Sequence, residues 1–292
     1  MSNVTRRREE VFRLIGSCAD RPGIVAKVAC YIAARGANII EAGQHQDHES
    51  GVFFMRYEVM LAEGDSEEKF RAGFIAVAEE LGMEWWLSSA LRKKRVAVMV
   101  SRHGHCLADL LHRWKFGDLP CDIVCVISNH TSLRELVEWN GVVFHHVPVP
   151  TDTPGRECAF QQISRLLEEA DVDVVVLARY MQILPGWFCE KWPNRIINIH
   201  HSFLPSFVGA NPYRQAAERG VKLVGATCHY VTAVLDGGPI IEQDVVRVRH
   251  NDCFTDIVRL GKDVEKSVLS RGLLYHLEDR VVVHRNKTIL FY

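Results

Sequence analysis

The spacing of apolar residues predicts a small α/β unit over the first part of the chain. Strands are expected over residues 11–18, 37–47, 52–60 and 83–87. Apolar residues recur at helical spacing after Pro22 and over residues 66–81, and Gly36 and Gly82 stand where these helices should end. The resulting order, βαββαβ, predicts a ferredoxin-like fold.

From residue 95 onward the pattern changes, because the strands are apolar on both faces. Such strands are expected over residues 95–101, 122–128 and 173–178, with helices over residues 106–116, 131–139 and 156–170 between them. Strands without alternation belong to parallel sheets that helices cover on both sides. We therefore expect a Rossmann-like, mostly parallel α/β fold that binds ligands beyond the carboxyl ends of its strands.

The rest of the chain continues this second part. A strand over residues 195–200, a helix near 212–219, strands over 222–231 and 239–248, a helix over 253–277 and a hairpin over 280–291 are expected. The polar, basic stretch over residues 88–94 (SSALRKK) marks a linker. We therefore expect two domains, residues 1–88 and residues 89–292.

The composition of the chain argues against binding to nucleic acid or to membranes. The 292 residues carry a formal net charge of −1, so the basic excess typical of proteins that bind nucleic acid or anionic membranes is missing. No apolar run approaches the roughly 18–20 residues of a membrane span, and residues 1–10 lack the apolar core of a signal peptide. Nine scattered cysteines are typical of free thiols in a reducing compartment, so a cytoplasmic protein is expected.

Two expected strands have polar side chains suited to catalysis at their ends. Asn198 and His200 are two residues apart, so their side chains project from the same face of one strand. Thr227 and His229 repeat this arrangement on another strand. An amide and imidazoles are thus expected to gather at one place.

Asp236 lies in a turn that Gly237 and Gly238 allow to fold sharply. If it meets Asn198 and His200, the set suits acyl-group chemistry. The amide can donate to an oxyanion, the imidazole can move a proton, and the carboxylate can fix the imidazole tautomer and orient a water.

Two other interpretations of these residues stay open at this point. Asn198 can simply end a strand, His200 and His201 can be core histidines, and Asp236 can be an ordinary turn residue. In the second interpretation, His200, His201 and His229 bind a zinc ion, although their spacing matches no recognisable metal motif. Cys121 and Cys125 also lack a second pair at zinc spacing.

Several segments resemble the formyltetrahydrofolate deformylases, which belong to the wider folate formyltransferase family. They are residues 177–184 (LARYMQIL), 197–213 (INIHHSFLPSFVGANPY) and 223–244 (LVGATCHYVTAVLDGGPIIEQD), while residues 13–60 resemble an ACT domain. The most specific parts are the Asn-x-His pair, the Leu-Pro that follows it and the Asp-x-Gly-Pro turn.

The resemblance implies hydrolysis of 10-formyltetrahydrofolate to formate and tetrahydrofolate, within one-carbon metabolism and purine biosynthesis. By this resemblance Asn198 stabilises the tetrahedral oxyanion, and His200 donates to it or protonates N10 of the folate. Asp236 holds His200 and helps to place the attacking water. No cofactor besides the folate substrate and no metal is expected.

The resemblance also implies a wall of the pterin pocket over residues 179–184, where apolar side chains accompany the backbone groups. The same segment can instead be a plain strand-to-helix connection. The expected substrate-binding residues are Arg179, Tyr180, Met181, Gln182, Ile183, Leu184, Thr227, His229, Thr232 and Gly237.

A formyltransferase acting on a small amine is the alternative enzyme. One such transferase binds a phosphate on a loop of small donors, and here His105 and Cys106 follow Gly104 in the corresponding loop. That sequence resembles the deformylases, with water as acceptor. A regulator without catalysis is a third hypothesis, against which the intact Asn198, His200 and Asp236 set argues.

The chain departs from the usual deformylase pattern at three positions, Val208, Asn211 and Ala233. The usual residues there are two lysines and an acidic residue. None of the three positions carries a proposed catalytic group.

The ACT resemblance implies an amino-acid effector, with glycine and methionine as candidates, and a homo-oligomer. The matching positions are Asp20 and Gly23 in the loop before the first helix, and Asn38 and Ile39 on the next strand. Backbone N–H groups at that helix start can hold a carboxylate. Alternatively, Asp20 only caps the helix and the domain only forms a dimer.

Overall fold

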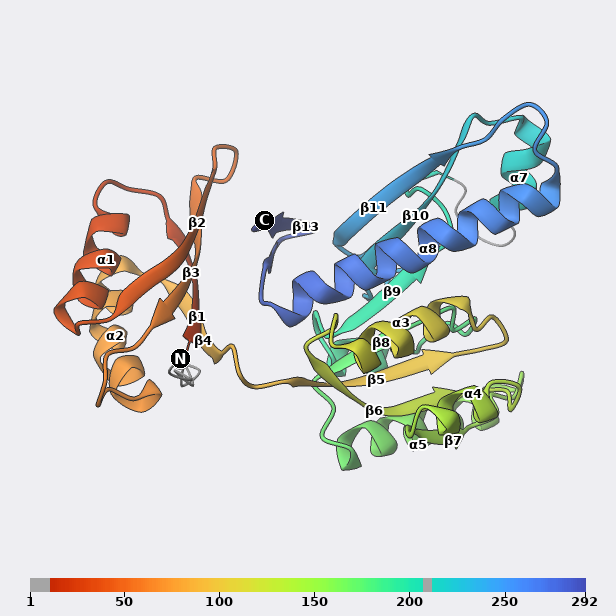
Figure 1. The fold of residues 1–292 in the computed structure, drawn as a ribbon, viewed down its shortest axis with the longest axis horizontal. Coiled ribbons are helices and arrows are strands. Elements are labelled where there is room, and N and C mark those ends of the chain that lie inside the picture. Colours follow the sequence, from red (N-terminus) through yellow and green to blue (C-terminus); the bar gives the residue numbers. More distant parts are fainter. Residues whose placement is uncertain (1–10, 207–211) are drawn as a thin grey trace, which may run out of the picture. The chain divides into compact units, whose positions relative to one another are not determined.

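The computed structural model describes residues 11–206 and 212–292 (Figure 1). The described residues form two compact units. The first contains the residues up to Arg92 together with Glu278–Val282 and Ile289–Tyr292, and the second contains Lys93–Leu277 and Val283–Thr288. We expected a division after residue 88; the units divide after Arg92, and the first also takes most of the end of the chain.

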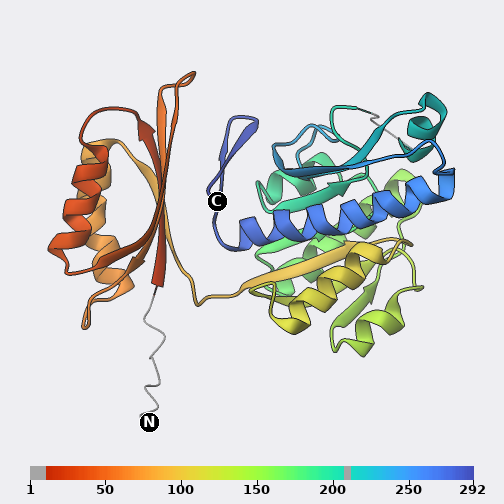
Figure 2. The ribbon, with the colours of Figure 1, turned by 45° about the horizontal axis from the view of Figure 1, so that its top comes forward.

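The first unit has the expected βαββαβ order. Its antiparallel sheet, in the order β2-β3-β1-β4, is formed by β1 (Val11–Ala19), β2 (Asn38–Asp47), β3 (Val52–Met60) and β4 (Glu84–Ser89). Helices α1 (Ile24–Ala34) and α2 (Glu67–Leu81) lie on one face of this sheet (Figure 2). Their apolar sides, with Phe70 and Phe74, form a core with alternate strand residues such as Leu14 and Tyr57.

The other face of this sheet is covered by the end of the chain. Arg56 is 1% exposed and donates to the carbonyl oxygens of Glu278 and Asp279 over 2.9–3.3 Å. Ile15 and Phe54 pack with Val282 and Phe291 in a second, smaller core. Val282 lies on β12 (Val281–His284) of the hairpin, and Phe291 directly follows its second strand, β13 (Lys287–Leu290).

The second unit is built on a seven-stranded sheet in the order β11-β10-β9-β8-β5-β6-β7. Its strands are β5 (Lys94–Val100), β6 (Cys121–Ser128), β7 (Val143–His146), β8 (Val174–Leu177), β9 (Ile196–His200), β10 (Leu223–Tyr230) and β11 (Ile240–Arg247). β7, β6, β5, β8 and β9 are parallel, and β10 and β11 continue the sheet antiparallel. The expected mostly parallel α/β fold is confirmed.

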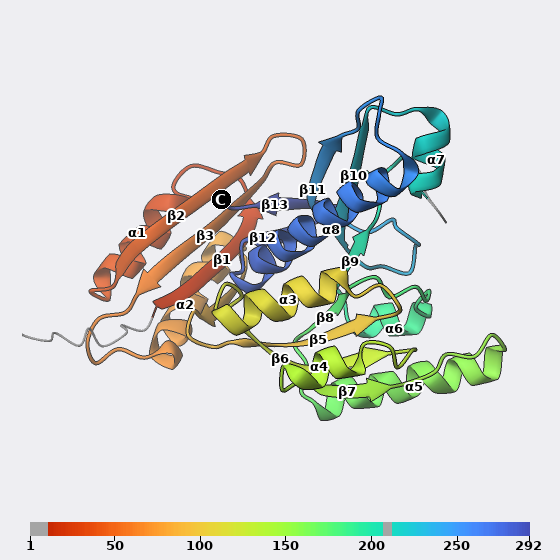
Figure 3. The same cartoon turned by 45° about the vertical axis from the view of Figure 1, so that its right-hand side comes forward.

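Helices cover this sheet. They are α3 (His105–Phe116), α4 (Arg134–Trp139), α5 (Thr153–Glu169), α6 (Gly186–Lys191), α7 (Pro212–Arg219) and α8 (Phe254–Leu277). α3 and α8 lie side by side (Figures 1 and 3), and α8 packs on β9, β10 and β11. α5 and α6 share a core with alternate residues of β5, Ala97 and Met99. Among the described residues, no helix is long and apolar enough to span a membrane.

Two short elements were missed by the sequence pattern. β7 has four residues and lies at the edge of the sheet, and α6 has six residues directly after Pro185. Neither is long enough to show a period. α5 also begins at Thr153, earlier than expected, because the Asp152 side chain accepts from Gly155 N and so caps the helix.

Candidate active site

Strand pairing brings the two expected Asn/His and Thr/His pairs together. β9 and β10 pair antiparallel, with Asn198 opposite His229 and His200 opposite Thr227. The Asn198 Nδ2 atom lies 3.1 Å from His229 Nε2. The amide and the second imidazole are therefore direct cross-strand partners.

The hydrogen bonds of His229 fix its tautomer. Its Nδ1 lies 2.9 Å from the carbonyl oxygen of Tyr230, which can only accept, so Nδ1 carries the proton. Burial lowers the pKa of His229, which keeps the ring neutral. Nε2 is then an acceptor for the Asn198 amide, and this bond sets the orientation of that amide.

Asp236 reaches the same place from the turn between β10 and β11. Its backbone has φ of 53°, a left-handed conformation that Asp tolerates better than most residues. The turn closes with Gly237 N donating to Val234 O at 3.1 Å. At Gly238 an added Cβ would lie 1.8 Å from the carbonyl oxygen of Tyr230, so only glycine fits there.

The Asp236 carboxylate contacts both imidazoles. Its Oδ1 atom lies 3.3 Å from His200 Nδ1 and 3.8 Å from His229 Nε2. Burial acts to raise the pKa of Asp236, but the hydrogen bond from His200 holds that pKa below its usual value. Asp236 is thus ionised at neutral pH and accepts from the His200 ring.

His200 is left with one unsatisfied nitrogen. Its ring is buried, and within residues 11–206 and 212–292 its Nε2 atom has no hydrogen-bond partner. Buried polar atoms are nearly always paired in folded proteins, with protein or with ordered water. This atom is therefore where a ligand or a water is expected to bind.

These groups open into a cavity of about 300 Å³, which we call the catalytic cavity. Asn198, His200, His229 and Asp236 all line it. Its other lining residues are Leu177, Arg179, Tyr180, Met181, Gln182, Ile183, Leu184, Cys189, Ile199, His201, Val231, Thr232, Ala233, Val234 and Leu235. The volume is that of a small-molecule site.

The segment over residues 179–184 forms one wall of this cavity. Met181 and Ile183 are more than half exposed, so apolar surface is available to a flat ring. Met181 N donates to Ser101 Oγ at 3.0 Å, and Ser101 Oγ donates to Asn129 Oδ1 at 2.7 Å. The wall is thereby tied to the end of β5.

Two residues expected to bind substrate do not line the catalytic cavity. Thr227 is fully buried, and its hydroxyl donates to Ser202 O while accepting from Leu204 N and Gln243 Nε2. Thr227 therefore holds the segment that follows β9. Gly237 shapes the turn instead, since a Cβ there would meet Val234 Cγ1 at 2.7 Å.

Sequence reasoning missed part of the lining. Val234 and Leu235 border the cavity although both side chains are mostly exposed. The sequence could have indicated them, because two large apolar residues in a glycine-rich turn rarely pack in a hydrophobic core and are therefore candidates for binding a ligand. Ala233, one of the departures from the usual pattern, also lines the cavity. Val208 and Asn211 lie outside the described residues.

The zinc interpretation of the three histidines does not fit their bonding. Both nitrogens of His229 are occupied by Tyr230 and Asn198, and His200 Nδ1 faces Asp236. In the described part of the chain one other cluster has suitable atoms close together, namely His105, Cys106 and Glu265. There Glu265 already binds His105, Arg179 and Tyr213, and burial raises the pKa of the Cys106 thiol well above its usual value. These groups are committed to one another, so we place no metal there.

The four expected effector residues occupy two ends of the first unit. Asp20 accepts from Gln46 Nε2 at 2.5 Å beside the end of β2, and Gly23 begins α1 with φ of 95°. Asn38 and Ile39 start β2 opposite Met60 and Val59, at the far end of the sheet. The N-terminal cap of α1 is Gly23, without a side-chain bond, so Asp20 does not cap the helix.

Comparison with known proteins agrees with this geometry. The formyl transferase family matches residues 94–273, and the ACT domain family matches residues 13–68. The formyltetrahydrofolate deformylase of Bacillus subtilis is 52% identical over 286 residues, which cover 97% of this chain and 94% of that protein.

Solved structures show the same likeness. A formyltetrahydrofolate deformylase from Pseudomonas syringae is 55% identical, with a TM-score of 0.94, and the match covers 99% of this chain and 97% of that one. A glycinamide ribonucleotide transformylase from Symbiobacterium toebii is 33% identical, with a TM-score of 0.65; the match covers 68% of this chain and 95% of that one. The chain therefore belongs to the formyl transferase family, among its formyltetrahydrofolate deformylases.

Proposed function

We propose that the chain hydrolyses 10-formyltetrahydrofolate to formate and tetrahydrofolate. The observation that carries this proposal is the unsatisfied Nε2 of His200 in the catalytic cavity, with Nδ1 of the same ring on the ionised Asp236. Such a nitrogen is placed to take a proton from a water, while the carboxylate stabilises the imidazolium that forms. Family membership supplies the substrate.

The reaction then follows from the groups around the cavity. Water attacks the formyl carbon as its proton passes to His200 Nε2. The Asn198 amide uses one hydrogen on His229, so its other hydrogen is available to the oxyanion that develops. The C–N10 bond breaks as His200 returns the proton to N10, and formate leaves.

No cofactor besides the folate is proposed, and no metal. The formyl carbon has the same oxidation state in the substrate and in formate, so the reaction needs no electron carrier. The groups that activate water and stabilise charge are those of Asn198, His200 and Asp236. Residues Arg179–Leu184, with Thr232, are proposed to hold the pterin ring.

Transfer to a phosphorylated amine is disfavoured by the first turn of α3 and the loop before it. His105 Nε2 lies 2.7 Å from Glu265 Oε2, and Cys106 is buried, so neither side chain is available to a phosphate. A Cβ at Gly104 would lie 2.7 Å from Leu133 Cδ2, which shows how closely this loop is packed. We therefore assign water as the acceptor.

The test is to incubate the protein with 10-formyltetrahydrofolate alone and to measure formate and tetrahydrofolate. Equal amounts of both, formed without an amine, are the expected result. Formation of tetrahydrofolate without formate, and only after glycinamide ribonucleotide is added, would assign a transferase. A parallel sample with a chelator should keep its rate, and inhibition that zinc reverses would contradict the mechanism.

We further propose that the first unit binds an amino acid between two copies of the chain. β2 is an edge strand, so two copies can pair their β2 edges antiparallel. This brings the start of β2 with Asn38 and Ile39 in one copy beside the end of β2 in the other, where Gln46 donates to Asp20. Gly23 begins the nearby α1, where backbone N–H groups can hold a carboxylate.

Calorimetry with glycine and with methionine, together with sedimentation velocity, tests this arrangement. The expected result is a homo-oligomer that binds one of the two amino acids. A monomer that binds neither at millimolar concentration would leave the unit with a structural role. We place the enzyme in the cytoplasm, in keeping with cysteines that are all free in the structure.

A further inference from the structure

A second cavity lies next to the catalytic cavity. Its volume is about 590 Å³, and we call it the side cavity. It shares Arg179 and His201 with the catalytic cavity, so the two adjoin along these side chains. The residues that line the side cavity but not the catalytic cavity have no part in the proposed hydrolysis.

A buried carboxylate organises its inner end. Glu265 on α8 is 1% exposed and lies 2.7 Å from His105 Nε2 and 3.3 Å from Arg179 Nη1, with the Tyr213 hydroxyl as a further donor. Burial acts to raise the pKa of Glu265, but the bond from His105 and the charge of Arg179 hold it below its usual value. The carboxylate is thus ionised and committed to these three partners.

Arg179 keeps donors that the protein does not use. Its side chain is 9% exposed, and its Nε atom has no hydrogen-bond partner among the described residues. A guanidinium has five N–H donors in a fixed fork, which matches a carboxylate. A buried, partly unused guanidinium that lines a cavity is an anion-binding group.

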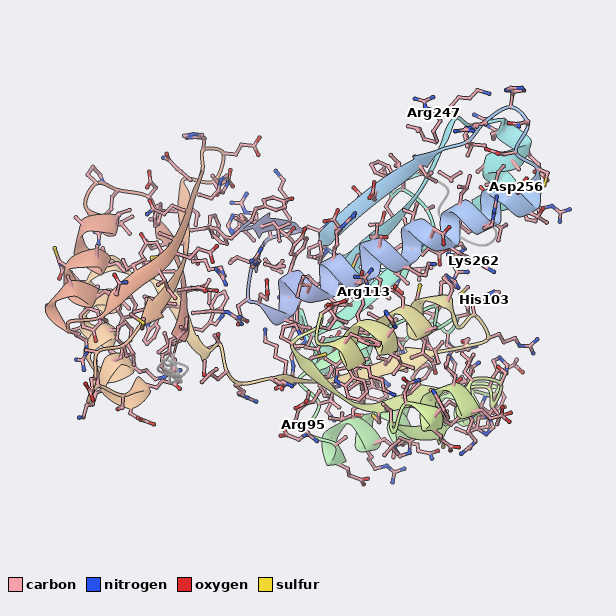
Figure 4. All side chains as sticks on the ribbon, viewed as in Figure 1. Arg95, His103, Arg113, Arg247, Asp256 and Lys262 are labelled. Atoms are coloured by element: carbon pink, nitrogen blue, oxygen red, sulfur yellow. The ribbon has the colours of Figure 1, made fainter. Side chains whose placement is uncertain are left out.

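The lining of the side cavity has one more cationic side chain than it has carboxylates. Arg179 pairs with Glu265, and Arg214 pairs with Glu218 on the surface at 3.5 Å. Among the described residues, Lys262 on α8 forms no ion pair with either lining carboxylate, Glu218 or Glu265. Lys262 on α8 and His103 in the loop before α3 are labelled in Figure 4, and both side chains line the side cavity.

The neighbouring histidine responds to this positive field. Burial lowers the pKa of His103, and the charges of Arg179, His105 and Lys262 lower it further, against a smaller raising effect of Glu265. On the catalytic side, the ionised Asp236 repels an anion. The side cavity is lined by two carboxylates, Glu218 and Glu265, but by three cations, Arg179, Arg214 and Lys262. A small carboxylate is therefore favoured in the side cavity over the catalytic cavity with Asp236.

We propose that the side cavity is a carboxylate site that receives formate as it leaves the catalytic cavity. This inference rests on the proposed hydrolysis, because only that reaction makes formate beside Asp236. The folate stays in the catalytic cavity while formate occupies the side cavity. Product inhibition by formate should therefore be noncompetitive with respect to the folate.

Initial rates at several folate and formate concentrations, with sodium chloride keeping the ionic strength constant, test the proposal. Lys262→Ala should raise the inhibition constant of formate by roughly fivefold or more, since a hydrogen bond to a charged group is lost. Lys262→Arg should restore it. Lys266→Ala is the matched control, because Lys266 lies one helical turn away, outside the lining, and pairs with Asp263 at 2.7 Å.

Binding of ¹³C-formate, followed by NMR line broadening without folate, gives a readout that needs no turnover. The wild-type protein should broaden the signal, and Lys262→Ala should lose this effect. An unchanged inhibition constant in Lys262→Ala, or competitive inhibition, would overturn the proposal. So would a raised KM for folate with unaltered formate binding, since the site would then hold the folate's own carboxylates. A chain without hydrolysis would overturn the proposed function, while the NMR arm still decides whether the cavity binds formate.

Discussion

His229 and His200 lie on neighbouring strands, yet their bonding gives them different tasks. Both nitrogens of His229 are occupied, one by the Tyr230 carbonyl and one by the Asn198 amide. His200 has one nitrogen on Asp236 and one without a partner in the described structure. His229 is thus suited to orienting the amide, whereas His200 has an atom available for proton transfer.

Replacing each histidine by alanine separates these tasks. His200→Ala should lower kcat by roughly 10²–10⁴, the usual contribution of a proton-transfer group. His229→Ala should cost only about tenfold, because Asn198 loses a partner but keeps its amide. Steady-state kinetics at saturating folate measures both. Equal losses, with circular dichroism unchanged, would contradict the assignment.

Asp236→Asn should leave the fold intact and lower turnover by about 10⁴, as loss of the Asp does in a catalytic triad. The left-handed φ of 53° at this position suits Asn as well as Asp, so the turn is kept. Asn cannot stabilise an imidazolium as a carboxylate does. If the variant retains more than a tenth of wild-type kcat, Asp236 is only a turn residue.

His201 gives the folded protein a dependence on pH. Burial first, and then the charge of Arg179, lower the pKa of His201 from 6.5 to about 3. As the pH falls from 6.5 towards 3, the unfolded chain takes up a proton at this residue and the folded chain does not, so stability decreases. His201→Gln should therefore flatten the fall of the urea midpoint between pH 7 and pH 4.5. If the urea midpoint of the variant falls as steeply with pH as that of the wild type, other titratable groups govern the pH dependence of stability.

At the scale of elements, the wall of the catalytic cavity depends on a strand end outside it. Ser101 follows β5, and its hydroxyl accepts from Met181 N and donates to Asn129. Three connections after parallel strands are thereby joined at the carboxyl edge of the sheet. We expect their alignment to affect folate binding more than the proton transfer.

Ser101→Ala should raise the KM for folate about fivefold, with a smaller change in kcat, because one hydrogen bond that holds the wall is lost. Ser270→Ala is a matched control. Ser270 is as buried as Ser101, but within the described residues its hydroxyl bonds only to the Ser267 carbonyl of its own helix. Similar kinetics for the two variants would remove the role of Ser101.

Most elements of the fold could be predicted from the sequence because their patterns are long. The two-residue spacing of Asn198 and His200 likewise placed both side chains at one site. Thr227 has the same spacing from His229, but its hydroxyl is used inside the sheet, which depends on the partners Ser202 and Gln243. Contacts between distant segments of this kind leave no periodic pattern. The side cavity, whose residues come from five separate segments, was missed for the same reason.

At the scale of the molecule, the first unit is completed by residues from the end of the chain. Arg56 donates to the Glu278 and Asp279 carbonyls, and the Phe291 ring occupies the space beside Gly43, where a Cβ would lie 2.6 Å from it. Glu278 directly follows α8, which carries Glu265 and Lys262. A domain cut after residue 88 or Arg92 therefore lacks part of its own core.

Phe291→Ala should destabilise the first unit by about 3 kcal/mol, the lower end for a buried Phe. Phe116→Ala is the control, because Phe116 is 72% exposed and its loss should cost less than about 0.5 kcal/mol. Urea unfolding followed by circular dichroism measures both. Equal effects would show that the Ile15, Phe54, Val282 and Phe291 cluster contributes little.

The position of Glu278–Val282 and Ile289–Tyr292 in the first unit also has a consequence for synthesis on the ribosome. The four strands of that unit emerge early, but the whole of Lys93–Leu277 is translated before its covering residues appear. At about 5–20 residues per second, this delay is on the order of ten seconds or more. During this delay Ile15, Phe54 and Arg56 are exposed to solvent, because the residues that bury them in the folded protein have not yet been made. The nascent chain therefore presents an apolar sheet face to chaperones until Glu278–Val282 and Ile289–Tyr292 have been translated.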